Sequence, residues 1–211
     1  MKGNIKLISG KRIRSPITNQ TRPTTSKVRE AIINILGKDL EGSSWLDLCS
    51  GTGVMACEVF QKGATRILAI ENHRATSKIC ELNLNDVSNN LDKSSHCEVI
   101  SKDVISFLKK GPKDKKIKFI QNFQDCDERF DFVFLDPPYD LEIYELSQKI
   151  LLSRGWVKNT STLICEYSSK SLPAIHNGWK LIKKKIYGNT SLLFLIPNQA
   201  LNCFDDTDSM H

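Results

Sequence analysis

One stretch of the sequence combines a strand, a glycine-containing turn and a helix in immediate succession. Residues 45–48 form a short apolar run around Asp47, which is typical of a buried strand. The turn at 49–53 contains Gly51 and Gly53, and we predict a helix directly after it, over 54–62. Because glycine lets the backbone approach a ligand that a Cβ atom would push away, this succession predicts the nucleotide-binding start of a doubly wound α/β sheet. The turn lacks the Gly-Lys-Ser/Thr of a P-loop and the complete GxGxxG of a dinucleotide site.

Acidic side chains follow three further predicted strands at the point where each strand ends. The strand over 66–70 ends at Glu71, the strand over 97–101 is followed by Asp103, and a later apolar run ends at Asp136. The carboxyl ends of parallel strands share one edge of the sheet, so we expect these acids and the glycine turn to line one crevice. An acid at the position of Glu71 can accept hydrogen bonds from both ribose hydroxyls of a bound nucleoside.

The tetrapeptide at 136–139 predicts a platform for a planar base. Pro137 and Pro138 lack the N–H that a sheet requires and favour an extended backbone in the residue before each of them, so the strand must end here. A base with an exocyclic amine can stack on Tyr139, and the amine can donate to Asp136 and to the Pro137 carbonyl. These two acceptors would point the nitrogen lone pair toward an incoming electrophile.

Length and composition limit the class of protein. A chain of 211 residues with 40% hydrophobic content can bury one good core, so we expect one domain with appendages. We find no apolar segment long enough for a membrane span and no apolar core of a signal peptide, which predicts a cytoplasmic protein. The seven cysteines are scattered and never spaced as CxxC. This pattern indicates reduced thiols and no disulfide framework or metal site.

The N-terminal region concentrates positive charge. Residues 1–30 contain eight Lys or Arg and one Glu, while the whole chain has a formal charge of +6. Residues 5–8 and 11–17, separated by Ser9 and Gly10, predict a short basic hairpin that is too polar to belong to the core. A phosphate backbone is the expected partner of such an arm. The basic residues expected to contact RNA are Lys11, Arg12, Arg14, Arg22 and Arg29.

A helix is predicted directly after the basic arm. Thr24 or Thr25 would cap it, and Val28, Ile32, Ile35 and Leu36 follow at helical spacing on one face. We expect the helix to end at a glycine, either at position 37 or at position 42.

These motifs resemble those of class I S-adenosylmethionine-dependent methyltransferases that act on exocyclic amines of bases. The resemblance lies in residues 47–53, Glu71, Asp103 and the tetrapeptide at 136–139. Residues 8–11 and 22–30 resemble, more specifically, the bacterial 16S rRNA guanine-N2 methyltransferase family of the small ribosomal subunit. The likeness extends from about residue 5 to residue 197.

The family resemblance implies a fold and a domain layout. The fold would be α/β and Rossmann-like, with a mostly parallel seven-stranded sheet, an antiparallel last strand, helices on both faces and an N-terminal basic β-hairpin. The chain would divide into an arm at 1–22, a methyltransferase domain at 23–197 and an acidic, disordered tail at 198–211. Residues 113–129 depart from the family as an inserted loop.

The resemblance also implies roles for individual residues. S-adenosylmethionine would be bound by Asp47, Cys49, Ser50, Gly51, Thr52, Gly53, Glu71, Asn72, Asp103 and Val104, and the target guanine by Asp136, Pro137, Pro138 and Tyr139. Within this set the turn would cradle the methionine part of the cofactor. Glu71 would bind its ribose, and Asp103 its adenine amine. The partner would be 16S rRNA or the small ribosomal subunit, with no membrane and no metal, and we expect a monomer.

Two other functions remain open from the sequence. The motif at 136–139 also serves adenine amines, so an N6-adenine methyltransferase of DNA or RNA is one alternative, although little room remains for a DNA-recognition domain. The other is a non-catalytic RNA-binding factor of ribosome assembly that keeps the fold. The intact glycines and strand-end acids favour an enzyme over such a factor.

Overall fold

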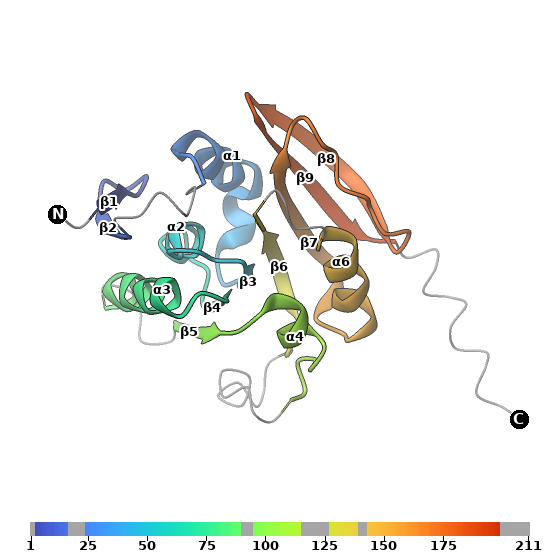
Figure 1. Cartoon of the computed structure of the whole chain (residues 1–211), viewed down its shortest axis with the longest axis horizontal. Helices are drawn as coiled ribbons and strands as arrows, with labels where there is room; N and C mark the ends of the chain where they lie inside the picture. The colour runs from blue at the N-terminus through green and yellow to red at the C-terminus, as the bar shows by residue number, and fades with distance from the viewer. Residues whose placement is uncertain (1–2, 17–23, 90–94, 115–126, 139–142, 199–211) are drawn as a thin grey trace, which may run out of the picture.

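A seven-stranded sheet forms the centre of the molecule (Figure 1). The computed structural model describes residues 3–16, 24–89, 95–114, 127–138 and 143–198. In spatial order the strands are β5 (His96–Ser101), β4 (Arg66–Glu71), β3 (Ser44–Leu48), β6 (Phe130–Leu135), β7 (Val157–Ser168), β9 (Thr190–Pro197) and β8 (Trp179–Tyr187). All neighbouring pairs from β5 to β7 are parallel, whereas β9 runs antiparallel to both β7 and β8. The predicted sheet and its antiparallel last strand are confirmed.

Helices cover both faces of this sheet. One face carries α1 (Ser26–Leu36), α2 (Val54–Phe60) and α3 (Arg74–Ser88), and the other carries α4 (Val104–Leu108) and α6 (Tyr144–Ser153), as Figure 1 shows. A short 3-10 helix, η1 (Gly37–Leu40), follows α1. Two apolar clusters fill the spaces between these layers. Successive residues of a strand point to opposite faces, so β3 contributes Trp45 to one cluster and Leu46 and Leu48 to the other.

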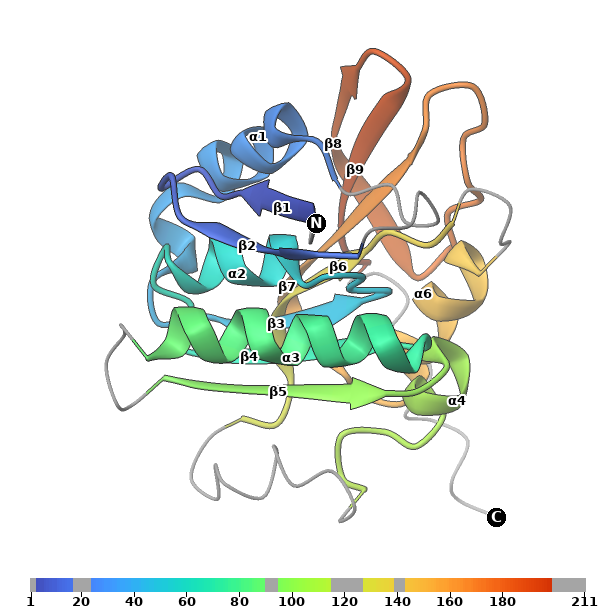
Figure 2. The same ribbon diagram turned by 60° about the vertical axis from the view of Figure 1, so that its left-hand side comes forward.

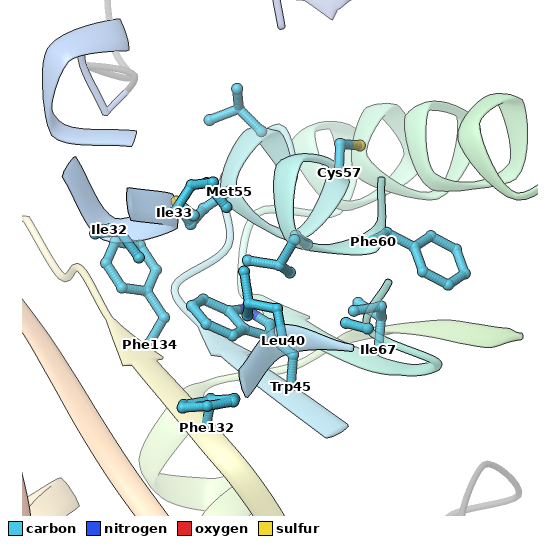
Figure 3. Close-up of a cluster of buried hydrophobic side chains, with 14 of the residues drawn as sticks. Ile32, Ile33, Leu40, Trp45, Met55, Cys57, Phe60, Ile67, Phe132 and Phe134 are labelled. Atoms are coloured by element: carbon cyan, nitrogen blue, oxygen red, sulfur yellow. The ribbon is translucent and has the colours of Figure 1, made fainter. Parts of the chain in front are cut away.

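Trp45 lies at the centre of the first cluster (Figure 3). Its ring centroid lies 6.1 Å from that of Phe132 and 6.0 Å from that of Phe134, both on the adjacent strand β6. All five residues of β3 are buried. The continuous apolar runs of β3 and β6 are therefore those of central parallel strands covered on both faces.

The chain reverses its direction of travel through the sheet between β5 and β6. It runs outward from β3 through β4 to β5, and then returns to place β6 on the other side of β3. Ligands of open α/β sheets bind outside the carboxyl ends of the strands at such a switch point. The topology therefore places the expected ligand site at the carboxyl ends of β3 and β6.

The predicted basic hairpin forms, but its relation to the core was predicted wrongly. β1 (Gly3–Lys6) pairs antiparallel with β2 (Arg12–Ser15), and the hairpin lies over α2 and α3 (Figure 2). Leu7 and Ile13 are only 2% and 3% exposed and belong to the same cluster as Trp45. Apolar side chains between the basic ones bury one side of the hairpin, and the charge of the arm conceals this pattern in the sequence.

Helix α1 begins and ends where the sequence predicts. Thr25 is the N-cap, and its side chain accepts a hydrogen bond from the Val28 N–H at 3.4 Å. Gly37, with a φ of 54°, ends the helix. The predicted insert at 113–129 lies mostly outside the described residues, as does the predicted tail beyond Asn198.

No helix among the described residues is long and apolar enough to cross a membrane. Within those same residues, His, Cys, Asp and Glu side chains form no group of three or more that could hold a metal ion.

Candidate active site

The glycine turn and the strand-end acids gather at the carboxyl edge of four neighbouring strands, β5, β4, β3 and β6. Cys49, the first residue after β3, lies among them. Burial raises the pKa of the Cys49 thiol, and the carboxylates of Glu71, Asp136, Asp47 and Asp103 raise it further, in that order. The structure therefore brings together the acids that the sequence places at separate strand ends.

The turn after β3 owes its shape to three left-handed residues. Cys49, Gly51 and Gly53 have φ values of 62°, 54° and 75°. A Cβ atom on Gly53 would lie 2.5 Å from the Cys80 Sγ atom of α3, whereas a Cβ atom on Gly51 would meet nothing within 4 Å. Gly53 is thus required for packing of the turn against α3, and Gly51 borders open space where a ligand can approach the backbone.

The Glu71 carboxylate is held beside this turn by two backbone groups. Its Oε2 atom accepts a hydrogen bond from the Gly51 N–H at 2.9 Å, and its Oε1 atom accepts one from the His73 N–H at 2.8 Å. An ionised carboxylate has about four acceptor sites, so two neutral donors leave capacity for the hydroxyls of a ribose. The neighbouring Asn72 side chain is exposed.

Asp103 is exposed just beyond β5. Its Oδ1 atom accepts a hydrogen bond from the Ser106 N–H at 2.8 Å and so caps α4. The side chain of Val104 is buried, 4% exposed, in the apolar cluster on the α4 face. Sequence reasoning did not foresee the capping role of Asp103, although the position of an Asp just before a short helix is a common signal for it.

Asp47 is the most deeply buried acid of the site. It is 1% exposed, and neither of its carboxylate oxygens makes a hydrogen bond to any described residue. Burial raises its pKa well above the usual range, and the charge of Asp136 adds to this. The nearby Ala56 N–H and Trp45 indole oppose the rise only partly, because neither reaches hydrogen-bonding geometry with the carboxyl group. A buried polar group without a partner is costly, so it suits a site whose ligand carries a donor such as an ammonium group.

Asp136 is half-buried at the end of β6. Its backbone N–H donates to the Leu48 carbonyl at 3.4 Å, which joins the end of β6 to the end of β3. Its Oδ2 atom accepts a hydrogen bond from the hydroxyl of Thr24 at 3.1 Å. Pro137 is buried and Pro138 exposed, while Tyr139 lies outside the described residues. The structure therefore shows an oriented carboxylate at the predicted position.

Thr24 is the site residue that sequence reasoning missed. It is 6% exposed and lies 112 positions before its partner Asp136. The signal available was the pair Thr24-Thr25, because only one of them is needed to cap α1.

The basic residues expected to contact RNA fall into different environments. Arg12 is exposed. The Lys11 ammonium and the Arg14 guanidinium are both within hydrogen-bonding distance of Asp86 of α3, so they hold the hairpin onto the domain. Arg22 lies outside the described residues.

Arg29 does not have the exposure that the sequence suggested. It is 4% exposed, and its Nε atom lies 2.9 Å from the Glu58 Oε1 atom. Its other two nitrogens donate to the carbonyls of Thr24 and Lys6 at 2.6 and 2.8 Å. Arg29 is therefore removed from the expected RNA contacts, because a buried and fully engaged guanidinium cannot reach a phosphate.

A family model described as "Conserved hypothetical protein 95" matches residues 5–196. Among curated proteins, the chain is 26% identical over 184 residues to Ribosomal RNA small subunit methyltransferase D of Buchnera aphidicola, covering 87% of this chain and 85% of that protein. It is 25% identical over 194 residues to the protein of the same name from Escherichia coli K12, covering 90% and 88%.

Solved structures share the fold. A candidate methyltransferase from Escherichia coli superimposes with a TM-score of 0.74 at 24% identity, covering 93% of this chain and 99% of that one. An RNA methyltransferase from Salinibacter ruber, solved in complex with S-adenosyl-L-homocysteine, gives a TM-score of 0.57 at 13% identity, covering 84% and 95%.

Proposed function

Because this chain belongs to the Conserved hypothetical protein 95 family, we propose that it methylates the exocyclic N2 amine of a guanine in 16S rRNA of the small ribosomal subunit. The observation that carries the proposal is the position of Asp136. Its carboxylate is oriented by Thr24 at the end of β6, directly beside the glycine turn and Glu71 at the ends of β3 and β4. An acceptor for an amine thus lies next to a site suited to a nucleoside. The names of the Buchnera and Escherichia relatives support rRNA as the substrate.

S-adenosylmethionine is the methyl donor in this proposal, and it supplies a methyl group activated by a sulfonium. Gly51 offers open space at the turn, and Glu71 offers fixed acceptors for the ribose. Asp47 offers a buried carboxyl group that is protonated without ligand and whose ionised form the methionine ammonium would stabilise. Asp103 accepts from the adenine amine. The contributing residues are Asp47, Cys49, Ser50, Gly51, Thr52, Gly53, Glu71, Asn72, Asp103 and Val104.

Methyl transfer needs position more than proton chemistry. A displacement on a good electrophile is accelerated chiefly by holding the nucleophile in line, and no strong base is required. Asp136 and the Pro137 carbonyl accept hydrogen bonds from the amine and offset positive charge developing on its nitrogen. The exposed Pro138 stiffens the loop, and Tyr139 stacks on the guanine. The N–C bond would form as the C–S bond of the sulfonium breaks, with S-adenosylhomocysteine as the leaving group. The methylated amine would then lose its proton to solvent.

The substrate base must be accessible to this platform. The amine of a paired guanine is hidden, so the nucleotide lies in a loop or is flipped out of its helix. Arg12, with Lys11, Arg14 and Arg22 near it in sequence, supplies positive charge for the RNA backbone. In this proposal the enzyme acts as a cytoplasmic monomer. Its catalytic unit is the methyltransferase domain at 23–197 together with the docked hairpin of the arm at 1–22, followed by the tail at 198–211.

The test is methyl transfer to small-subunit RNA by the purified protein. Labelled S-adenosylmethionine should place a methyl group on N2 of one guanine, as mapped by mass spectrometry of digested RNA. A methyl group on N6 of an adenine would instead establish the adenine alternative. Cofactor binding by calorimetry without any transfer would identify a binding factor and reject the enzyme.

The catalytic assignment is tested by Asp136→Ala. We expect single-turnover methylation to fall by roughly two orders of magnitude, because stabilisation of the developing charge is lost, while cofactor affinity stays within a few fold. The matched control is Asp131→Ala at the opposite end of the same strand, where Asp131 bonds to Lys158 and Ser44. Equal rates for Asp136→Ala and the wild type would remove Asp136 from the chemistry.

A further inference from the structure

A buried ion pair joins α1 to α2 close to the candidate active site. Arg29 and Glu58 are 4% and 1% exposed, and their Nε and Oε1 atoms lie 2.9 Å apart. The apolar packing between the two helices already supplies their contact through residues such as Val28, Ile32 and Met55. The attraction between two buried charges is largely offset by the free energy of removing them from water. Stability alone therefore does not explain the Arg29–Glu58 pair.

Among the described residues, the remaining side-chain hydrogen bonds of this pair go to two segments outside the helices. Arg29 donates to the Lys6 carbonyl at the end of β1 and to the Thr24 carbonyl. The Glu58 carboxylate accepts from the Ile8 N–H at 3.0 and 3.2 Å through its two oxygens. A single ion pair therefore fixes both the N-terminal hairpin and the backbone of Thr24.

Thr24 carries the connection into the active site. Its carbonyl is held by Arg29, and its hydroxyl donates to the Asp136 Oδ2 atom at 3.1 Å. Thr24 is 6% exposed, so water competes little for either bond. A continuous set of polar contacts thus runs from the hairpin through Arg29 and Thr24 to the carboxylate beside the glycine turn.

We propose that Arg29, Glu58 and Thr24 are positioning residues, which orient the Asp136 carboxylate for methyl transfer and make that orientation depend on a docked hairpin. The inference rests on the proposed function. The hydroxyl of Thr24 holds the Oδ2 atom of the carboxylate that receives the substrate amine. The ion pair fixes Thr24 and, through Lys6 and Ile8, ties it to the element that carries Arg12.

Substitutions at two adjacent threonines separate this role from a structural one. Thr24→Val removes the hydroxyl and keeps the branched shape, Thr24→Ser keeps the hydroxyl, and Thr25→Val removes only the helix cap. We expect Thr24→Val to lower the single-turnover rate about tenfold with cofactor and RNA affinities within twofold, the loss of one hydrogen bond to a charged group. Thr24→Ser should recover the rate to within about threefold. Thr25→Val should lower the melting temperature and leave the rate of the folded enzyme unchanged.

Two outcomes would overturn the proposal: a wild-type rate in Thr24→Val, or an equal loss of rate in Thr25→Val.

The dependence of the Asp136 orientation on the docked hairpin is tested by hydrogen exchange in Glu58→Gln, with the Ile8 and Asp136 amides as reporters. Faster exchange at both amides supports coupling of the hairpin to the catalytic loop, and faster exchange at Ile8 alone refutes it.

The exchange measurement needs no substrate. If the wild-type protein methylates no small-subunit RNA, the proposed function fails while the coupling is still decided by exchange. If the wild type is active and the two amides respond independently, the coupling fails while the proposed function stands.

Discussion

The two glycines after β3 have different reasons to be glycine. Both have a positive φ, which costs about 1–2 kcal/mol for any other residue. Only Gly53 also faces a close neighbour, the Cys80 Sγ atom, whereas Gly51 faces open space and donates its N–H to Glu71. Gly53 is therefore needed for packing, whereas Gly51 is needed to leave space for a ligand.

We therefore expect alanine to reduce mainly stability at position 53 and mainly cofactor affinity at position 51. Gly53→Ala should lower the free energy of unfolding by about 2–4 kcal/mol, because backbone strain and overpacking add. Gly51→Ala should cost only about 1 kcal/mol of stability but weaken S-adenosylmethionine binding tenfold or more, because the new methyl group occupies ligand space. Urea denaturation and calorimetry measure the two quantities. Unchanged cofactor affinity in Gly51→Ala would place the cofactor elsewhere.

Asp47 links stability to pH. Its pKa is raised in the folded protein, first by burial and then by Asp136, so folding favours its protonated form. The stability this gives is complete below the unfolded pKa of about 3.9 and is lost as pH rises through the folded value. Asparagine cannot ionise, so Asp47→Asn avoids this loss of stability. The mutant should have a larger free energy of unfolding than the wild type, by about 1–3 kcal/mol at pH 8 and by less at pH 5.

Asp131 provides a control of opposite sign. Burial alone would raise its pKa, but hydrogen bonds from Lys158 and Ser44 lower it below its usual value. The contribution of Asp131 to the free energy of unfolding is present above its pKa in the unfolded chain. It disappears as the pH falls through its pKa in the folded protein. Asp131→Asn should therefore be less stable than wild type at neutral pH and converge with it in acid. An Asp47→Asn difference that does not change with pH would contradict a protonated Asp47.

At the scale of elements, the hairpin β1–β2 differs most from its prediction. The sequence suggested a basic appendage, but Leu7 and Ile13 enter the main apolar cluster and Asp86 of α3 holds Lys11 and Arg14. The hairpin is therefore part of the folded domain, and its basic residues are divided between docking and exposure.

Leu7→Ala should lower the unfolding free energy by about 2–4 kcal/mol, because it removes buried methyl groups and leaves a cavity. The adjacent Ile8→Ala is the matched control, since Ile8 is 37% exposed and keeps its N–H bond to Glu58 after substitution. We expect it to cost less than about 0.5 kcal/mol. Equal small losses from both substitutions would show that the hairpin is an appendage after all.

Elements with continuous local patterns were predictable from sequence. The apolar runs of β3 and β6 and the Thr25 cap of α1 are signals contained within a few residues. The roles of Thr24 and Arg29 were not predictable, because their partners lie 112 and 29 positions away. Counting charges also led to the wrong prediction that Arg29 contacts RNA. A basic residue contributes the same charge to the count whether its partner is a phosphate or a buried glutamate.

At the scale of the whole molecule, positive charge lies on several separate surfaces. Arg12 is exposed on the hairpin, and β8 carries a row of exposed lysines at the far edge of the sheet. These lysines are Lys180, Lys183, Lys184 and Lys185. Lysines at an edge strand prevent pairing with another chain, so those of β8 have a structural role that Arg12 of the hairpin does not share.

Arg12→Ala tests the hairpin without disturbing its docking. We expect weaker RNA binding and a log–log salt slope smaller by about one unit, because one fewer counterion is released. Cofactor affinity and melting temperature should not change. Lys38→Ala is the control, since Lys38 is exposed in η1, near the amino end of β3. An unchanged slope in Arg12→Ala would move the phosphate contacts elsewhere, with the lysines of β8 next to be tested.

The strand order also dictates when each half of the site can form. Trp45 of β3 pairs with Ile67 on one side and with Phe132 on the other, so the first pairing closes a far shorter loop than the second. The glycine turn and Glu71 belong to the early, local unit, and Asp136 arrives only when the distant β6 is added. During synthesis on the ribosome, where chains fold from the N-terminus, the nascent protein would complete its nucleoside-binding half first. It would acquire the group that receives the substrate only when more than half of the chain has emerged.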